Sequence, residues 1–272
     1  LSLSGEIPAK GFIIAAGSNL NNDGDWIGLY NSEEELVDQV SFGDVAVPYN
    51  VNVVNNPPDG QSTGRTIDGG PDFQTFANPT RGSSNGTTLS TLYVDSEWSD
   101  SENDGGHTWG FDAFSSIQDA INIAPEGATI NVESGEYEEE LTIDKPLSLV
   151  GDAGDETIGP GENAPTISSC GKVIRVDASD VSISGFILDG EGCGDLVIRL
   201  GTDVTEADVS DNEIVNGYRG VGLGGGNNGD PASDNTIENN NIHSNETGVR
   251  IDSGDDNIIQ NNNIHNNDSE GI

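Results

Sequence analysis

The sequence predicts an all-β protein in two parts, a β-sandwich followed by a parallel β-helix with a capping helix at its N-terminal end. Three observations carry this prediction. Gly, Asn and Asp are abundant throughout the chain, a composition that suits turn-rich β structure better than helix bundles. Short apolar runs separated by turns fill residues 1–90, and a repeat with a period near 22 residues runs through the C-terminal part.

The repeat is clearest in two phrases, DNTIENNNIHSN (residues 234–245) and DNIIQNNNIHNN (residues 256–267), which share nine of twelve positions. Two apolar residues five positions apart recur earlier as Val209 and Ile214. A period of about 22 residues with short β segments and Asn/Gly corners is typical of a parallel β-helix, whose stacked coils bury a continuous apolar column. We interpret the asparagines as architecture, because stacked amides can hydrogen-bond along the column and Asn tolerates the left-handed backbone of corners.

A helix is expected within residues 114–127, FSSIQDAINIAPEG. Ser115 and Gln118 have the spacing of a capping box at its start, and Pro125 and Gly127 stop it. Four apolar residues fall on one helical face and predict the side that covers the column: Ile117, Ala120, Ile121 and Ala124.

The first part of the chain has a different pattern. Residues 1–88 contain apolar runs such as GFIIAA, DWIGLYN and LVDQVSFG, which are separated by turn signals and predict a sandwich. Residues 89–110 form a polar connector around one strand, and residues 111–272 form the β-helix.

A resemblance refines the prediction for the first part. The stretch DWIGLYNSEEELVDQVSFG, followed by PPDGQSTGRTIDGG and NPTRGSSN, resembles the second part of a lamin-tail domain. Its most specific parts are DGxSxGR (residues 59–65) and NPTxGxxN (residues 78–85). The resemblance implies an immunoglobulin-like sandwich that acts as an attachment or interaction module and brings no catalytic residues. Because the family usually begins one or two strands earlier, it also implies an N-terminally truncated copy.

The second part also resembles known families. Residues 91–272 are similar to the right-handed parallel β-helix families of secreted and surface proteins, and residues 111–152 look like the start of pectin methylesterases and of NosD-like periplasmic proteins. The resemblance implies a pectin-lyase-like fold built of PbH1 repeats, and we expect it to be C-terminally truncated because the chain stops within a repeat. The fold does not fix the function, since it carries lyases, hydrolases, esterases and non-enzymes.

The charge excludes several partners. A net charge of -39, from 9 basic and 48 acidic residues, repels nucleic-acid backbones and anionic membrane surfaces. No apolar run approaches the roughly 18 residues of a membrane span. Acidity spread along the whole chain indicates cation-rich surroundings, such as the high salt of a halophilic host, and the alternative is that it only maintains solubility.

The two cysteines point to a compartment. Cys170 in CGKVIRV and Cys193 in CGDLVIRL lie 23 residues apart in matching contexts, so they should stack on adjacent coils within disulfide range. A disulfide indicates an oxidising location, here extracellular or cell-surface. The alternative is a pair of buried free thiols.

No catalytic motif of the fold stands out, because neither a DFIFG-like nor a GHG phrase occurs in the sequence. Arg219, beside the insertion 224–234, is the candidate base of a lyase, with Arg175 and Arg199 stacked on adjacent coils. His243 and His265 occupy equivalent positions and are candidate metal ligands, although a solvated ladder is the simpler reading. An acidic cluster at residues 95–104 could hold Ca²⁺ but lacks EF-hand spacing, so we expect a solvated linker.

These observations favour a non-enzymatic, secreted or cell-surface, monomeric scaffold for adhesion or carbohydrate binding, with polysaccharides or cell-surface glycans as partners and no cofactor. The alternative is a polysaccharide-active enzyme with its site on a β-helix face, a Ca²⁺-dependent lyase before an esterase or hydrolase.

Overall fold

The structure is a computed structural model that divides the chain into two compact units, Leu1–Thr88 and Leu89–Ile272, and each is described by itself. Within its described part, no helix is long and apolar enough to cross a membrane. The described residues are 24–31, 34–43, 53–54, 57, 61–65, 70, 72–77, 89–99, 106–152, 158–193, 195–225 and 231–272.

The first unit contains two small sheets among its described residues. One has the order β1-β2-β3, in which β1 and β2 form an antiparallel hairpin, and the other pairs β4 with β5 antiparallel. The predicted runs at residues 11–16 and 78–85 lie outside the described residues. The strands are β1 (Gly24–Tyr30), β2 (Leu36–Gly43), β3 (Val53–Val54), β4 (Ser62–Arg65) and β5 (Phe73–Phe76).

Arg65, the last residue of the DGxSxGR phrase, joins these two sheets. Its guanidinium forms an ion pair with Asp38 of β2 and donates a hydrogen bond to the carbonyl of Gly70. It also lies over the ring of Phe73, 4.5 Å from the centroid, where the ring quadrupole attracts a cation. A residue of the DGxSxGR phrase therefore has a structural role.

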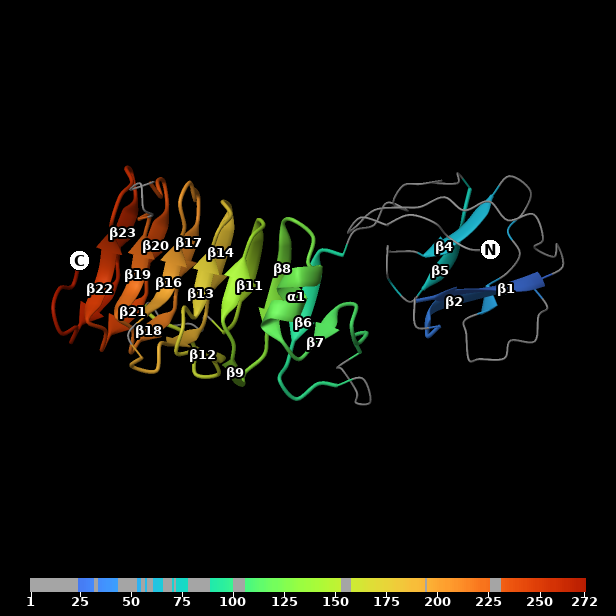
Figure 1. Ribbon diagram of the computed structural model, residues 1–272, viewed down its shortest axis with the longest axis horizontal. Helices are drawn as coiled ribbons and strands as arrows, with labels where there is room; N and C mark the ends of the chain where they lie inside the picture. The colour runs from blue at the N-terminus through green and yellow to red at the C-terminus, as the bar shows by residue number, and fades with distance from the viewer. Residues whose placement is uncertain are drawn as a thin grey trace. The chain divides into compact units, whose positions relative to one another are not determined.

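The second unit is a parallel β-helix of three sheets whose strands follow one another coil by coil (Figure 1). Sheet 1 has eight strands in the order β23-β20-β17-β14-β11-β8-β6-β7, sheet 2 has six in the order β24-β21-β18-β15-β12-β9, and sheet 3 has five in the order β10-β13-β16-β19-β22. The strand β6 opens sheet 1, although the sequence places it within the connector.

Sheet 1 comprises β6 (Thr91–Val94), β7 (Ala113–Phe114), β8 (Ala128–Val132), β11 (Leu147–Val150), β14 (Val181–Ser184), β17 (Asp208–Ser210), β20 (Thr236–Glu238) and β23 (Ile258–Gln260). Sheet 2 comprises β9 (Glu136–Glu138), β12 (Thr166–Ser168), β15 (Ile187–Asp189), β18 (Glu213–Val215), β21 (Asn241–His243) and β24 (Asn263–His265). Sheet 3 comprises β10 (Leu141–Ile143), β13 (Ile174–Val176), β16 (Leu196–Leu200), β19 (Arg219–Leu223) and β22 (Thr247–Ile251).

The coil register is the one that the repeat predicts. Ile183, Val209, Ile237 and Ile259 are successive partners in sheet 1, and Ile242 pairs with Ile264 in sheet 2 in the same way. All but the two residues of the last coil are fully buried, and those two pack against the same core. Each coil thus contributes its apolar residues to one continuous column, which no single coil could bury.

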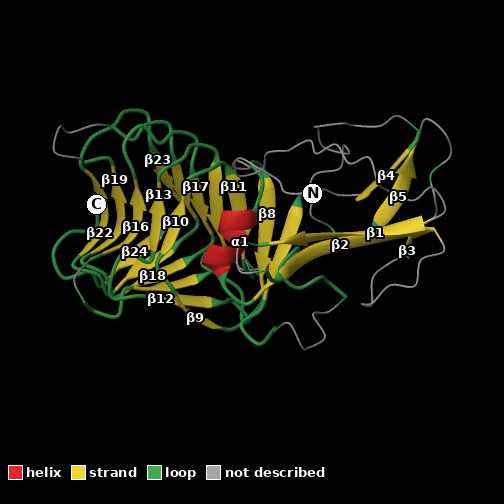
Figure 2. Cartoon of the chain, turned by 45° about the vertical axis from the view of Figure 1, so that its right-hand side comes forward, coloured by secondary structure: helices red, strands yellow, loops and turns green. Residues whose placement is uncertain are grey.

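The predicted helix forms as α1 (Ile117–Ile123) and packs on β6, β7, β8 and β10 at the N-terminal end of the column, where Figure 2 shows it in red. Its apolar face is buried as expected: Ile117, Ala120, Ile121 and Ala124. Lys145 donates to three carbonyls at the end of the helix, those of Ile121, Asn122 and Ala124. A cation at this end also interacts favourably with the helix dipole.

The predicted capping box is wrong by one residue. Ser116, not Ser115, is the N-cap, because its backbone is extended and its Oγ accepts a hydrogen bond from the amide of Asp119. Gln118 instead bonds the backbone of Thr142 in β10. Glu139, from the loop before β10, accepts hydrogen bonds from the first two helical amides, those of Ile117 and Gln118.

Corners of the coils divide two tasks between consecutive residues. In the corners of the phrase DNTIENNNIHSN the first residue has a left-handed backbone, as at Asn239 (φ 56°), and the next is a buried asparagine, as at Asn240. The phrase DNTIENNNIHSN is therefore two five-residue units, each with a corner residue, an inward Asn, an outward residue, an inward Ile and another outward residue, followed by the start of a third. The corner residues are Asp234, Asn239 and Ser244, and the inward asparagines are Asn235, Asn240 and Asn245.

The inward asparagines connect consecutive coils. The Oδ1 atom of Asn240 accepts a hydrogen bond of 3.0 Å from the backbone amide of Asn212, one coil earlier. Its Nδ2 atom donates to the carbonyl of Val209 at 2.7 Å, and its own amide donates to Oδ1 of Asn262 on the next coil at 2.9 Å. The side chains thus satisfy buried backbone groups that the sheets leave unpaired at the corners.

Replacing one inward asparagine should destabilise the protein strongly. In Asn240→Ala, the buried amide of Asn212 and carbonyl of Val209 lose their partner, which should lower the free energy of unfolding by about 3 kcal/mol. The control is Asn263→Ala in the second phrase, residues 256–267, where the side chain is exposed and the expected loss is below about 0.5 kcal/mol. Equal losses in urea titrations of the two variants would contradict the division between inward and outward asparagines.

Candidate functional site on the β-helix

A shallow, open pocket follows the corner between sheets 2 and 3. It has a volume of about 220 Å³ and is built from the turns of four successive coils, between β15 and β16, β18 and β19, β21 and β22, and after β24. We call it the corner pocket, and it is lined by Gly192, Asn216, Gly217, Tyr218, Ser244, Glu246 and Asp268.

The lining combines one aromatic ring with several oxygen groups. Tyr218 is 40% exposed, and around it lie the carboxylates of Glu246 and Asp268, the hydroxyl of Ser244 and the amide of Asn216. An aromatic side chain offers a flat apolar surface, and carboxylate and amide oxygens accept hydrogen bonds from hydroxyl groups. This combination suits a ligand with an apolar face and a hydroxyl-bearing edge.

The inward asparagines fix the floor of the corner pocket. The amide of Gly217 donates to Oδ1 of buried Asn245 at 2.8 Å. A Cβ at Gly217 would lie 2.5 Å from a methyl group of Val197, so no larger residue fits without a shift. Asn216 donates through Nδ2 to Asp189 at 2.9 Å, which holds the left-handed turn (φ 60°) in place.

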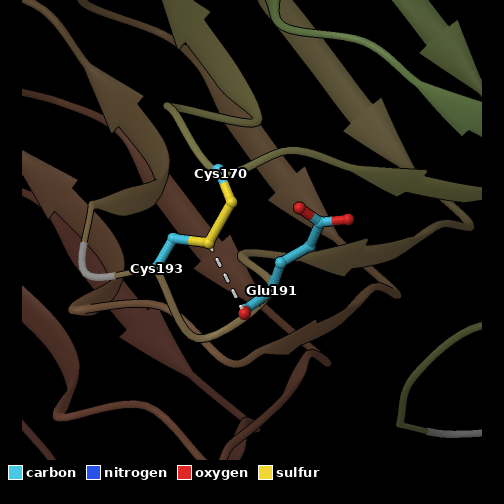
Figure 3. Close-up of side chains that lie close together, drawn as sticks. All are labelled: Cys170, Glu191 and Cys193. Atoms are coloured by element: carbon cyan, nitrogen blue, oxygen red, sulfur yellow. Dashed lines mark hydrogen bonds between the residues drawn. A yellow bond between two sulfur atoms is a disulfide. The ribbon is translucent and has the colours of Figure 1, made fainter.

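A disulfide joins Cys170 and Cys193 on adjacent coils, with their Cα atoms 5.1 Å apart (Figure 3). It lies at the turn that brings Gly192 to the rim of the corner pocket. The sulfur of Cys193 lies 3.6 Å from the carbonyl oxygen of Glu191. Glu191 and the two cysteines are close enough to suggest metal ligands, but bonded sulfurs offer no thiolate, so this group serves as a covalent brace.

Reducing the disulfide should loosen this corner. Because it closes a loop with a sequence separation of 23 residues, the chain-entropy argument gives it about 3 kcal/mol of stability. We expect dithiothreitol to lower the unfolding midpoint of the native protein and to leave a Cys170→Ser/Cys193→Ser variant unchanged. A thiol assay that finds two reactive cysteines before reduction would contradict the bond.

The arginines do not converge on one point. Arg175 and Arg199 are partners in adjacent strands, as the sequence predicts. Arg175, however, pairs with Asp177 at 2.8 Å on its own coil, while Arg199 donates to the carbonyl of Gly225 at 2.8 Å. The two guanidinium groups therefore bind different local partners and do not form one cationic site.

Arg219, the candidate base, is held in an ion pair. Its guanidinium lies 2.7 Å from Asp252, and Arg250 binds the other oxygen of the same carboxylate at 2.7 Å. Partial burial raises the pKa of Asp252, but hydrogen bonds from Arg250 and Arg219 outweigh it and hold that pKa below its ordinary value. Arg219 also lies 5.6 Å from the ring of Tyr218. Of the insertion beside it, residues 226–230 lie outside the described residues.

The two repeat histidines form a stack on sheet 2. The rings of His243 and His265 are 4.9 Å apart and nearly parallel. They project outward, as expected, but both are only partly exposed. His107, in the other part of the unit, stacks on Tyr93 and bonds Asp112, which accounts for its position.

The acidic cluster before the helix gives little support for a Ca²⁺ site among the described residues. Asp95 uses its carboxylate to accept a hydrogen bond from the amide of Glu97 at 2.9 Å, which closes a local turn. The cluster's other acidic or amide members lie outside the described residues: Asp100, Glu102, Asn103 and Asp104.

Sheet 1 contains an acid that the sequence did not single out. Asp208 faces outward in β17, but burial raises its pKa; a hydrogen bond from Ser210 opposes this shift and the charge of Glu238 adds to it. Its Oδ1 is buried and has no hydrogen-bond partner among the described residues. Asp211 has a raised pKa for related reasons, with burial first and then the charges of Glu238 and Asp208.

Asp208→Asn should stabilise the protein near neutral pH. The folded-state pKa lies above the unfolded value, so the ionised carboxylate destabilises the fold, and this penalty disappears as the pH falls through the raised pKa. We expect a higher unfolding midpoint for the variant at about pH 7 and a gap that narrows toward about pH 4. Asp255→Asn, at an exposed acid, is the control. A lower midpoint for Asp208→Asn at neutral pH would show that the carboxylate stabilises the fold.

Comparison with known proteins bears on the second unit. Residues 166–272 match the family model described as right handed beta helix region. This unit is a right-handed parallel β-helix. The fold predicted from the repeat is thereby confirmed, including its handedness. No curated protein and no solved structure matches the chain, so the lamin-tail and NosD-like resemblances stay predictions.

The corner pocket is the part of the site that sequence reasoning missed. Its residues come from four turns that are far apart in the chain, and only Ser244 belongs to one of the two repeat phrases. The sequence did hold one indication of the pocket. Tyr218 and Glu246 occupy equivalent positions in successive repeats, so stacking of the coils brings them to the same corner. The structure places Arg219 beside Tyr218 of this pocket, and His243 of the histidine stack next to Ser244, whose Oγ lies 3.1 Å from Nδ1 of that histidine.

Proposed function

We propose that this protein is a secreted or cell-surface scaffold that binds carbohydrate at the corner pocket without chemical turnover. The observation that carries the proposal is the exposed ring of Tyr218 among fixed oxygen groups. A sugar ring has an apolar C–H face that can lie on an aromatic ring and hydroxyl groups that can donate to carboxylates and amides. The pocket is smaller than the several hundred cubic ångströms of enclosed ligand sites, which suits one sugar unit of a longer chain.

Charge narrows the class of sugar. Glu246 and Asp268 line the pocket, and the whole chain carries a net charge of -39. Acidic polysaccharides would be repelled from such a surface, whereas neutral or amino sugars would not. The proposed ligand is therefore a neutral or amino-sugar glycan.

The disulfide supports the proposed location, since such bonds persist outside the reducing cytosol. For the first unit we propose the attachment role that its resemblance to lamin-tail domains implies. Support comes from Arg65, whose contacts give a residue of the most specific phrase a defined structural role.

A Ca²⁺-dependent polysaccharide lyase is the second candidate, because Arg219 lies beside the exposed Tyr218. A base at this position would have to reach the substrate. The ion pair with Asp252 opposes that, because the guanidinium of Arg219 is held 2.7 Å from the carboxylate of Asp252. This contact favours the binding scaffold over the lyase.

The test is a panel of neutral, amino and acidic polysaccharides, with and without Ca²⁺, measured for binding and for the absorbance of unsaturated products. Tyr218→Ala should weaken binding of a neutral or amino glycan by at least about tenfold, which corresponds to about 1.4 kcal/mol. Trp109→Ala removes another exposed aromatic residue and should leave binding unchanged. Product formation that depends on Ca²⁺ and is lost in Arg219→Ala would replace the scaffold by the lyase.

A further inference from the structure

The corner pocket arranges an aromatic ring and two carboxylates in one column. Tyr218, Glu246 and Asp268 line the pocket from equivalent turns of three successive coils. The amide of Thr247 donates to the carbonyl of Tyr218 at 3.0 Å, and the amide of Ser269 donates to the carbonyl of Glu246 at 2.8 Å. These backbone bonds keep successive members of the column one strand spacing apart, about 4.8 Å.

The two carboxylates are not neutralised by the described part of the protein. Glu246 and Asp268 are both exposed, and among the described residues neither carboxylate forms an ion pair or a hydrogen bond. By contrast, Asp195 is bound by Lys172 at 3.1 Å, and Asp252 is bound by two arginines. The lining of the pocket, as the structure describes it, includes no lysine or arginine. The pocket thus presents two negative charges that a cationic ligand can meet.

Tyr218 adds a surface that attracts cations. The face of an aromatic ring carries negative potential and binds a cation within about 6 Å of its centroid. The guanidinium of Arg219 lies 5.6 Å from this centroid, yet Tyr218 remains 40% exposed. Arg219 is also bound to Asp252 at 2.7 Å, so its charge is compensated within the chain. Exposed ring surface beside free carboxylates suits an ammonium group, which can contact both.

Unpaired acids alone would not define a site on this chain, whose 48 acidic residues give a net charge of -39. That charge raises the concentration of cations near the whole surface. The corner pocket differs from such a general surface because it is hollow and carries an exposed aromatic ring next to its two carboxylates. It can therefore hold both the charge and the apolar face of one ligand unit.

We infer that the corner pocket selects a glycan with free, protonated amino groups, such as a glucosamine polymer, over its N-acetylated and uncharged counterparts. The inference rests on the proposed carbohydrate binding and adds the chemical class of the sugar. The apolar face of one sugar unit would lie on Tyr218, while its ammonium group would lie near the carboxylates of Glu246 and Asp268. An N-acetyl group removes the positive charge, so the acetylated sugar keeps only the first of these two contacts.

Binding of two oligosaccharides to the unaltered full chain tests the inference. Short oligomers of glucosamine and of N-acetylglucosamine, equal in length, are titrated by calorimetry at about pH 6, where amines retain their proton. At low salt, we expect the amine form to bind more tightly by about tenfold or more, because only this form can pair with the two carboxylates. The preference should shrink in ~1 M salt, where the Debye length falls to about 3 Å.

Two double variants separate the pocket from general attraction by the acidic surface. Glu246→Gln/Asp268→Asn keeps the shape of both side chains and should abolish the preference for the amine form, which leaves the two oligomers with similar affinities. The matched control, Glu126→Gln/Asp255→Asn, neutralises two exposed acids elsewhere in the same unit and should keep the preference. A preference that survives in the pocket variant would overturn the inference, since the surface charge alone would then explain it.

The outcomes also distinguish this inference from the proposed function. If both oligomers bind the native protein equally and Tyr218→Ala weakens both, carbohydrate binding stands and the selection for amines is overturned. If neither oligomer binds, the inference is likewise overturned, and the neutral glycans of the panel then decide the proposed function.

Discussion

The hydrogen bonds of the buried asparagines at the corners are the interaction on which the β-helix depends. A coil that turns sharply leaves backbone amides and carbonyls without sheet partners, and burying such groups unpaired is costly. Asn240 meets this need with a single side chain that accepts from the coil before it and is itself bonded to the coil after it. Because the asparagine side chain spans the rise between coils, it also fixes which residues face each other in the coils from Asn212 onward.

The need to stack coils in one register explains how much of the fold the sequence could predict. The pairing of Ile237 with Ile259 was predictable, because a repeat that buries one face leaves a single register in which the apolar residues meet. The helix and its buried face were predictable for the same reason. The exact cap was not, because Ser115 and Ser116 are both good caps and the choice depends on Glu139, which only the fold brings to the helix start.

The candidate site was much less predictable than the fold. Burial of Asp208 depends on side chains of neighbouring coils, so the residues next to it in the sequence do not predict it. The corner pocket is likewise a property of stacking: Tyr218 has no signature of its own and gains its surroundings from turns on other coils. The histidines were visible as an equivalent pair, but only the structure shows that they reach toward Glu213 and Asn241 in a common direction.

Because each corner pairs a turning residue with an inward asparagine, a coil carries the groups that it needs to stack on its neighbours, and its gene segment can be duplicated as a unit. A coil with both residues presents the same upper and lower surface, so a copy inserted beside the original meets the donors and acceptors it needs. The near-identity of residues 234–245 and 256–267 has the form expected of such a copy. A gene that duplicates this segment lengthens the column by one step of about 4.8 Å and leaves its cross-section intact. The length of the outward face is therefore a trait that can change by whole units without a new folding problem to solve.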